Sequence, residues 1–291
     1  MDFESLKIFC AVAAELGITQ AAAKLGRVPS NVTTRIQNLE ADLGAELFVR
    51  PGKRLHLSTA GERFLGYAQR LLALEAEARQ VVAGAHDSGT LRIGSMESTA
   101  ASRLPAPLAA FSRDRPDVRL EVTTGASQGL LDSLRIGRLD CAFVALPAGL
   151  DAAPALAALG LQAEGVWTEE LLLLLPPHEQ ATSVSEVRTR TLAAFRPGCA
   201  YRGISEQALG IGTGPRWAIQ EMGSYHAMVA AVAAGTCVSL LPRSVLDLAT
   251  VPAGLRALPV CRAVTWLATR AGYGGPLFDA FRQALPRAVT P

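Results

Sequence analysis

The stretch AAAKLGRVPSNVTTRIQNLEADLGAELFVR, residues 21–50, ends one short helical pattern and begins a second that is rich in Thr, Asn, Arg and Gln. In the second pattern apolar residues recur at spacings of four, three and four, which predicts a helix with one buried face. These apolar residues are Val32, Ile36, Leu39 and Leu43. Proline suits a first helical position, so we expect the helix to run from about Pro29 to Leu43.

The opposite face of this predicted helix is polar in an unusual way. Solvated helix faces mostly carry Glu and Lys, whereas this one carries side chains that suit base edges and phosphates in a DNA major groove. They are Ser30, Asn31, Thr33, Thr34, Arg35, Gln37 and Asn38. We therefore interpret it as a DNA recognition helix.

Two further helices precede it. Leu6, Phe9, Val12, Ala13 and Leu16 recur at helical spacing, and Gly17 ends that pattern. A second short helix is expected from Thr19, as its cap, to Leu25, with Ala21, Ala22 and Leu25 facing inward. With a turn at residues 26–28, residues 18–37 form a helix-turn-helix pattern.

A basic hairpin follows in LFVRPGKRLHLS, residues 47–58. Apolar residues alternate on both sides of Pro51 and Gly52, which predicts two short strands with basic residues at their tip. Such a hairpin beside a helix-turn-helix acts as a wing that grips the DNA backbone or minor groove. The predicted DNA-binding residues are Thr19, Gln20, Pro29, Ser30, Asn31, Thr33, Thr34, Arg35, Arg50, Lys53 and Arg54.

Residues 59–84 read as one long helix in which apolar residues step by three and four, a heptad seam. A helix lying on a core would show a wider stripe, so we expect a pairing surface between two copies. The seam consists of Phe64, Tyr67, Leu71, Leu74, Ala78 and Val81. The following residues, AHDSG at 85–89, read as a hinge. The predicted domains are thus residues 1–58, a linker at 59–89 and a third domain at 90–291.

After residue 90 strands and helices alternate. Strands at 91–96, 118–125 and 140–146 enclose a helix at 98–115, softly broken by Pro105 and Pro107, and a helix at 127–137. This alternation indicates a parallel sheet. A second unit follows, and its expected elements are a strand at 171–175, a helix at 185–195, a strand at 199–203, a helix from 205, a strand at 217–222 and a helix at 224–234. After residues 236–242, a strand at 263–272 and a helix at 277–285 close the chain. Crossings near 146–147 and 264–267 would give lobe I (90–146 and 266–291) and lobe II (147–265), with a ligand cleft between them.

Several classes of protein are disfavoured. No apolar run approaches the roughly 20 residues that span a bilayer, and the amino terminus lacks the features of a secretory signal, so we expect a cytoplasmic protein without membrane contact. The five cysteines are far apart and odd in number, which predicts neither disulfides nor a zinc site. Catalytic and phosphate-binding motifs are missing, so an enzyme or a solute receptor is the weaker interpretation.

The spaced residues of the amino-terminal part resemble the winged helix-turn-helix of LysR-type transcriptional regulators. The matching positions are Phe9, Val12, Gly17, Thr19, Ala21, Ala22, Leu25, Val32, Ile36, Leu39, Glu40, Leu43, Gly44, Leu47, Phe48, Arg50, Leu57, Ala60 and Gly61. One departure is Val28-Pro29, where the family commonly has Ser-Gln. LRIG, RPDVRLEVTTG, LRIGRLDCAF and VAAGTCVSLLP resemble its effector-binding half more weakly.

The resemblance implies an all-α winged helix-turn-helix with a linker helix, followed by a two-lobed α/β effector domain like a periplasmic binding protein. It further implies that linker helices pair two winged domains, and that two dimers form a homotetramer. A symmetric dimer predicts double-stranded DNA with inverted half-sites as the target. RNA polymerase is a further expected partner.

The family's cleft residues map onto helix starts at Ser98 and Ser127 and onto Tyr201, Arg202 and Gly203 of the second lobe. The full predicted effector set is Ser95, Met96, Ser98, Thr124, Ser127, Tyr201, Arg202, Gly203, Gly223, Ser224 and Tyr225. Each serine also fits a plain helix cap. With Arg202 in the cleft, we expect a small organic acid as effector and no cofactor; if Glu97 pairs with Arg202, a neutral or zwitterionic ligand is expected instead.

A redox sensor is the alternative regulator. The segment GCAYR around Cys199 resembles that of the peroxide-sensing members of the family. Those members have a resolving cysteine nine residues further on, where this chain has Ala208. One cysteine does not form that disulfide, so we favour an effector-gated regulator.

Overall fold

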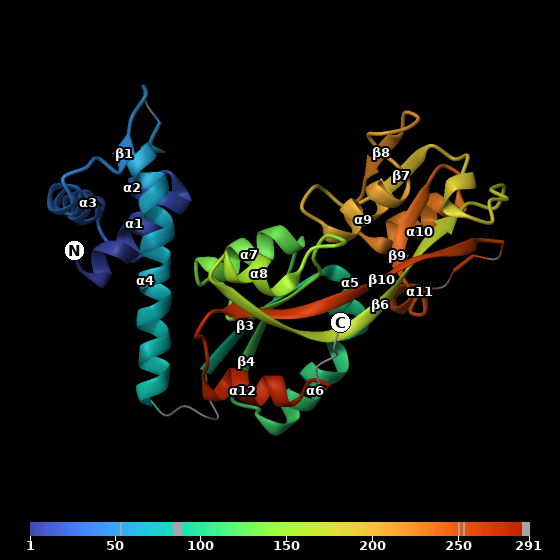
Figure 1. The fold of residues 1–291 in the computed structure, drawn as a ribbon. Coiled ribbons are helices and arrows are strands. Elements are labelled where there is room, and N and C mark those ends of the chain that lie inside the picture. Colours follow the sequence, from blue (N-terminus) through green and yellow to red (C-terminus); the bar gives the residue numbers. More distant parts are fainter. Residues whose placement is uncertain (53, 84–88, 250, 253, 287–291) are drawn as a thin grey trace. The chain divides into compact units, whose positions relative to one another are not determined.

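The computed structural model describes residues 1–52, 54–83, 89–249, 251–252 and 254–286. The chain divides into two compact units, one of residues 1–84 with 136–138 and one of residues 85–135 with 139–291 (Figure 1). The elements of the first unit are α1 (Phe3–Glu15), α2 (Ile18–Lys24), α3 (Pro29–Leu43), β1 (Phe48–Val49), β2 (His56–Leu57) and α4 (Thr59–Ala83).

The recognition helix α3 has the predicted bounds, and its apolar face closes the core of the first unit. Val32, Ile36 and Leu39 are buried against Phe9 of α1. The prediction for Leu43 is wrong, because it lies in the last turn before Gly44 ends the helix and is 37% exposed.

The start of α2 also differs from the prediction. Leu16 takes a left-handed conformation (φ 47°), and Gly17 then precedes a helix that begins at Ile18. Thr19 therefore lies within the first turn and is not the cap. The observed cap is Gly17, two residues before the predicted cap, because the chain turns at Leu16.

The wing is anchored to α3 by a carboxylate. Glu40 Oε1 accepts hydrogen bonds from the backbone amides of Leu47 (2.7 Å) and Phe48 (3.1 Å). β1 and β2 pair antiparallel, with Phe48 opposite Leu57. Gly61 lies so close to the Leu47 carbonyl that a Cβ there would be 2.0 Å from the oxygen, which lets α4 pack directly on the wing.

The residues of the predicted seam lie on two different apolar faces of the linker helix α4, one packed on the core and one exposed. Phe64 packs on the core of the first unit, with its ring 5.2 Å from that of Phe9, so its assignment to the pairing surface is wrong. Tyr67 and Leu74 are 63% and 61% exposed, and Leu71 is 36% exposed. Ala78 is also exposed. The Val81 side chain lies outside the described residues.

In the second unit the described residues form one eight-stranded sheet of order β4-β3-β5-β10-β6-β9-β7-β8. The first elements are β3 (Gly89–Ser95), α5 (Glu97–Ser102), α6 (Pro105–Asp114), β4 (Val118–Thr124), α7 (Ser127–Arg135), β5 (Cys141–Val144), α8 (Ala152–Ala157) and β6 (Leu161–Leu175). The later ones are the 3₁₀ turn η1 (Val184–Glu186), β7 (Thr191–Ala194), α9 (Ala200–Ala208), β8 (Ala218–Glu221), α10 (Tyr225–Ala233), β9 (Val238–Pro242), α11 (Arg243–Leu246), β10 (Arg256–Arg270) and α12 (Pro276–Gln283).

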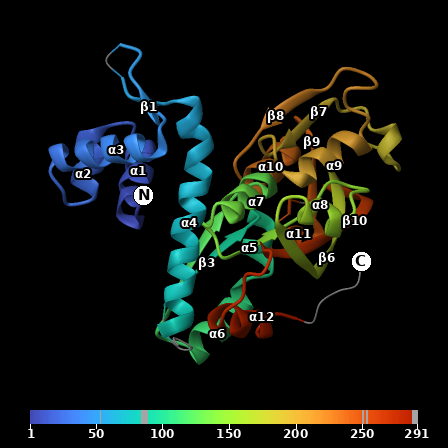
Figure 2. The ribbon, with the colours of Figure 1, turned by 60° about the vertical axis from the view of Figure 1, so that its left-hand side comes forward.

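Lobe I is a three-layer sandwich. β3 pairs parallel with both β4 and β5, as the sequence predicts. Phe143 of β5 faces α6 and α12, whereas its neighbour Val144 faces α7 and α8. The helix expected at 98–115, with a soft break at Pro105 and Pro107, is two separate helices, α5 and α6, because Pro105 begins a new helix. Figure 2 shows these layers from a second side.

The two long antiparallel strands β6 and β10 connect the lobes (Figure 1). Residues 266–269 of β10 pair with β5 of lobe I, and residues 171–174 of β6 pair with β9 of lobe II. Because β6 and β10 pair with each other along their length, both strands pass from one lobe to the other between these two paired segments. The crossing expected near residues 146–147 is therefore misplaced. After that point α8 returns to lobe I, because Leu156 is buried against Leu130 and Leu134 of α7.

Lobe II holds two wrong predictions. The expected helix 185–195 is η1 followed by β7, whose side chains alternate between two cores, Leu192 and Ala194 on one face and Ala193 on the other. The expected strand 199–203 is instead the start of α9. Tyr201 and Ile204 are buried on one helical face against the sheet, which fixes that segment as a helix.

Candidate functional site

The polar face of α3 is accessible. Ser30, Asn31 and Thr34 are exposed, and Thr33 and Arg35 are half-buried. The Thr33 hydroxyl donates to the Pro29 carbonyl, and the Thr34 hydroxyl donates to the Ser30 carbonyl, both at 3.0 Å. Their oxygens remain available as acceptors in these rotamers, and donation to a base requires the hydroxyl to rotate.

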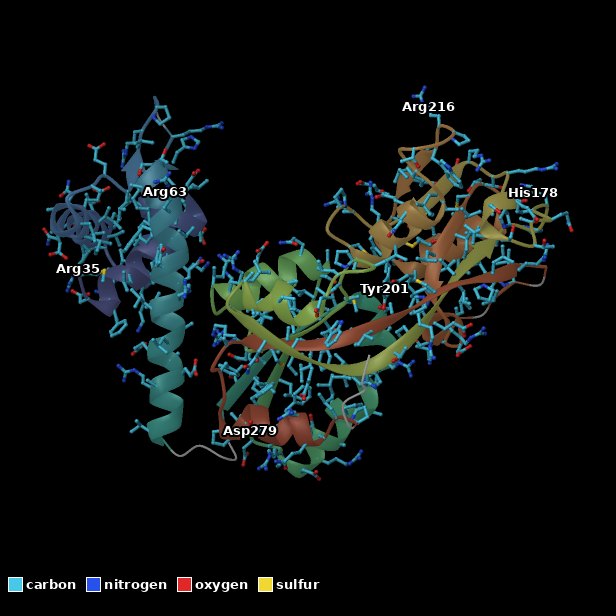
Figure 3. All side chains as sticks on the ribbon, viewed as in Figure 1. Arg35, Arg63, His178, Tyr201, Arg216 and Asp279 are labelled. Carbon is cyan, nitrogen blue, oxygen red and sulfur yellow. The ribbon has the colours of Figure 1, made fainter. Side chains whose placement is uncertain are left out.

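Acidic residues of α1 and of its N-terminal cap form ion pairs with basic residues of α2 and α3. Arg35 Nη1 lies 3.2 Å from Asp2 Oδ2, while the other Asp2 oxygen caps α1 through the Ser5 amide at 2.7 Å. Lys24 likewise pairs with Glu15 at 2.8 Å. Figure 3 marks Arg35 on α3. Arg35 therefore has to exchange Asp2 for DNA in order to make the predicted contact.

The wing arginines differ from Arg35. Arg50 and Arg54 are exposed, and neither forms an ion pair within the described residues of the chain. They are thus available for phosphates. Thr19 and Gln20 are exposed on α2. Lys53, the remaining predicted wing residue, lies outside the described residues.

A cleft of about 620 Å³ lies in the second unit between lobe I and lobe II. Its walls come from the ends of strands and the starts of helices in both lobes. It is lined by Met96, Glu97, Ser98, Thr124, Gly125, Ala126, Ser127, Phe195, Arg196, Pro197, Cys199, Tyr201, Glu221, Met222, Gly223 and Tyr225. Its size and its mixed polar and apolar walls suit a small molecule.

Seven of the predicted effector residues line this cleft. They are Met96, Ser98, Thr124, Ser127, Tyr201, Gly223 and Tyr225. Ser95, Arg202, Gly203 and Ser224 are not in the lining. Ser95 donates its hydroxyl to the Met96 carbonyl, and Ser224 accepts from the Ala227 amide as the cap of α10. Gly203 is exposed elsewhere on α9.

The position of Arg202 corrects the electrostatics expected for the site. Its Nε donates to Glu206 at 2.8 Å, and its Nη1 donates to Glu221 at 2.9 Å and to the Phe195 carbonyl at 3.1 Å. Arg202 therefore does not pair with Glu97. The helical start of α9 is the reason, since it places Arg202 one turn before Glu206.

Several polar atoms at the cleft are buried without a hydrogen-bond partner among the described residues. Glu97 Oε2, Ser98 Oγ and the Tyr201 hydroxyl line the cleft, and Thr265 Oγ1 lies on β10. Burial, and after it the negative charge of Glu169, raises the pKa of Tyr201, while the nearby Thr265 and Ser98 hydroxyls oppose that shift. Figure 3 marks Tyr201 in this region. Buried polar atoms without partners are costly, so the site is prepared for a ligand that supplies them.

The remaining serine of the set has a structural role. Ser127 Oγ accepts a hydrogen bond from the Ala145 amide at 3.2 Å, which links the first turn of α7 to the end of β5. The Ser127 hydroxyl thus already accepts a hydrogen bond from the protein, whereas the Ser98 hydroxyl has no hydrogen-bond partner among the described residues. Of the two helix-start serines, Ser98 is therefore the better candidate for contacting a ligand.

Cys199 lines the cleft as a half-buried thiol. Burial raises its pKa, and the nearby Arg202 and Tyr201 amides oppose the shift only partly. A raised pKa leaves the thiol protonated and weakly nucleophilic at neutral pH. This environment and the position of Ala208 do not favour the redox alternative.

Sequence reasoning missed several lining residues. Phe195, Arg196 and Pro197 follow β7 directly, and they were hidden by the mistaken helix at 185–195. The turn residues Gly125 and Ala126 follow β4, and Glu221 and Met222 end β8 or follow it. The available signal was their place at the carboxyl ends of strands, where ligands bind in open α/β sheets.

The described residues contain no group of three or more His, Cys, Asp or Glu that could hold a metal ion. Within the same residues, no helix is both long and apolar enough to cross a membrane.

Together the two units define a class of protein, a winged-helix DNA-binding protein with a two-lobed ligand-binding domain. Residues 3–62 match the family model of the bacterial regulatory helix-turn-helix protein, lysR family, and residues 84–290 match the LysR substrate binding domain. The chain belongs to the LysR family of transcriptional regulators.

Similar proteins agree with this assignment. The chain is 35% identical over 273 residues to the uncharacterized HTH-type transcriptional regulator YusT of Bacillus subtilis, with 92% of this chain and 88% of YusT covered. It is 34% identical to the regulator GltR of Bacillus subtilis over 84% of this chain and 81% of GltR.

Solved structures share the fold. Full-length OxyR from Pseudomonas aeruginosa superposes with a TM-score of 0.72 at 20% identity, covering 100% of this chain and 98% of that protein. CbnR in complex with its target DNA gives 0.66 at 21% identity, covering 98% and 99%. The chain is thus a DNA-binding transcriptional regulator with an effector-binding domain.

Proposed function

We propose that a small molecule bound between lobe I and lobe II changes how this regulator engages its operator. The observation that carries the proposal is the cleft, where Ser98 Oγ and the Tyr201 hydroxyl are buried without partners among the described residues. A ligand that bridges the lobes would satisfy both atoms and favour one relative position of the lobes.

The DNA partner is proposed to be a duplex with inverted half-sites. Thr33, Thr34 and Arg35 would contact base edges, because the amino-terminal part of a recognition helix enters the major groove. Arg50, Arg54 and Lys53 would hold phosphates. Accessibility of the α3 face and of the wing arginines supports these roles.

The effector is proposed to be a small organic acid. Arg196 supports this in place of Arg202, because it lines the cleft, is exposed, and forms no ion pair within the part of the chain that the structure describes. The first residue of α7, Ser127, lies on the cleft wall, and a helix amino terminus favours negative charge.

Self-association is proposed to use the exposed face of α4. Tyr67, Leu71 and Leu74 present apolar surface there that a second copy would bury. Leu71→Glu combined with Leu74→Glu places charges in that surface, so we expect loss of dimers and loss of operator binding. Analytical ultracentrifugation is the measurement, with Leu248→Glu as the control, because Leu248 is 62% exposed but lies in the other unit. An unchanged assembly in the double variant would place the interface elsewhere.

The remaining proposals follow from membership of the family. They are a tetramer built from two dimers, contact with RNA polymerase, a cytoplasmic location, and regulation without catalysis. Sedimentation of the full-length protein distinguishes dimer from tetramer.

DNase footprinting of the region flanking the gene, with and without candidate acids, tests the main proposal. We expect an inverted repeat to be protected and the footprint to change with an active compound. Ser98→Ala should abolish the change while the footprint of the free protein stays the same. A footprint that responds equally in both proteins would contradict the cleft as the effector site.

A further inference from the structure

The charged groups of the cleft are distributed unevenly between its lobes. Glu97 stands at the start of α5 in lobe I, whereas Arg196 and Glu221 come from lobe II. The nearest Glu221 oxygen is 2.9 Å from Arg202, so that carboxylate already has a cation. Glu97 and Arg196 are therefore the two charged groups left for a ligand, and they have opposite signs.

The negative charge of Glu97 has no cationic partner among the described residues. The side chain forms no ion pair within the described residues, and its Oε2 is buried and makes no hydrogen bond there. Burial raises the pKa of this carboxyl group, and the Tyr225 backbone and His226 oppose the shift only partly. An ionised carboxylate only accepts hydrogen bonds, so Oε2 requires a donor, and a ligand carboxylate placed beside it would be repelled.

The residue next to Glu97 favours the same kind of ligand group. Ser98 Oγ is buried, lines the cleft and can accept a hydrogen bond from a ligand. An ammonium group has three donors and a positive charge, so it can serve the carboxylate and a neighbouring hydroxyl together. A neutral hydroxyl on the ligand would satisfy Oε2 without offsetting its charge.

We infer that the effector carries a protonated amine that pairs with Glu97, in addition to the acid group proposed to face Arg196. The ligand class is therefore that of amino acids and similar zwitterions, with the amine held in lobe I and the acid in lobe II. This inference rests on the proposed effector cleft. It makes Glu97 the residue that distinguishes an amino acid from the corresponding simple acid.

The test is thermal unfolding and calorimetric titration of the full-length protein with matched pairs that differ only in the amine. The pairs are L-alanine and propanoate, L-leucine and 4-methylpentanoate, L-glutamate and glutarate, and L-phenylalanine and 3-phenylpropanoate. The proteins are the wild type, Glu97→Gln and the control Glu121→Gln. Glu121 is a half-exposed carboxylate on β4 that pairs with Arg119 and is not in the cleft lining.

We expect at least one amino acid to bind and its deaminated partner to bind at least about tenfold more weakly, the range for loss of a charged hydrogen bond. Glu97→Gln should lower the affinity for the amino acid by a similar factor, so that the amino acid and its deaminated partner bind with more similar affinities. Glu121→Gln should leave the affinities for both compounds unchanged. Binding of the simple acids alone, or amino-acid binding that is unaffected by Glu97→Gln, would overturn the inference and leave the effector cleft intact. Failure of every compound to bind would count against both.

Discussion

The recognition face of α3 and the cleft between the lobes both carry polar side chains, but these side chains are exposed to solvent on α3 and partly buried in the cleft. On α3, Asn31 and Thr34 are exposed, so solvent satisfies them until DNA replaces it. In the cleft, the Ser98 and Tyr201 hydroxyls are buried and have no partner among the described residues. Exposed polar groups cost little in the free protein, whereas buried unpaired ones lower its stability. Substitutions on the recognition face of α3 should thus change DNA binding alone, whereas substitutions in the cleft should change both the free energy of unfolding and effector binding.

Thr33→Ala tests the DNA side of this comparison with the largest expected effect. If the Thr33 side chain contacts a base, relative affinity among half-site variants should change by about 1–3 kcal/mol. The free energy of unfolding should change by less than about 0.5 kcal/mol, as for other surface substitutions. Competition binding with single-base variants is the measurement, and Thr33→Ser is the control that keeps the hydroxyl. A loss of affinity that is equal for all sequences would assign Thr33 to the backbone instead.

Arg50→Ala should weaken binding to every sequence alike. The wing arginine is exposed and available for a phosphate, and each phosphate contact contributes about 0.9 to the slope of log K against log salt concentration. We therefore expect that slope to fall by about one unit in fluorescence anisotropy titrations. Arg113→Ala on α6 is the control, because this exposed arginine belongs to the other unit. A shift in base preference would show that the wing reads sequence.

Tyr201→Phe should stabilise the ligand-free protein by about 1 kcal/mol, the lower end of the cost of an unpaired buried polar group. The substitution removes the buried hydroxyl and keeps the ring that packs beside Ile204. Chemical denaturation gives the free energy of unfolding, and the same variant should lose response to effector. Destabilisation by Tyr201→Phe would mean that the hydroxyl is satisfied in solution, and the contrast with α3 would then fail.

Glu97→Gln should have a smaller effect that depends on pH. Burial raises the pKa of Glu97 above its ordinary value of 4.5, and the Tyr225 amide and His226 oppose the shift. The folded protein thus holds this proton more tightly than the unfolded chain, and the stability it provides at low pH is lost as pH rises from 4.5 through the folded pKa. Urea titrations across that range should show the advantage of Glu97→Gln growing with pH and then levelling. Repeating them with His226→Gln removes the imidazole that opposes the shift in the Glu97 pKa. If the advantage of Glu97→Gln shrinks as pH rises, the predicted direction is wrong.

The reliability of the sequence patterns differed between these two regions. The helix from Pro29 to Leu43 was predicted with its observed bounds, because a stable apolar period of three and four is a local property of fifteen residues. Over residues 185–203 the structure differs from the prediction, with β7 in place of most of the helix and α9 in place of the strand. Leu192, Ala193 and Ala194 are all buried, so β7 shows no alternation that distinguishes a buried strand from a helix. The spacing of Arg202 and Glu206 was a helical signal that was overlooked.

This difference has a direct consequence for the site. A strand at residues 199–203 predicts that Arg202 faces the cleft, and a helix at 185–195 gives Arg196 no role there. In the structure α9 begins at Ala200, so Arg202 pairs with Glu206 and Glu221 away from the lining, and Arg196 lies in the cleft. The type of one local element thus decided which cation a ligand meets.

The sequence by itself determined the features that depend on neighbours along the chain. These are the helix-turn-helix with its basic wing, the long linker helix, the parallel sheet of lobe I, and the family that these patterns resemble. Only the tertiary structure decided where the chain crosses between lobes, which face of α4 remains exposed, and which polar atoms of the cleft lack partners. The physical reason is that burial and pairing depend on residues distant in sequence, as when Arg202 meets Glu221 or Tyr201 approaches Thr265. The spacing of residues along one helix or strand does not determine such contacts between distant segments.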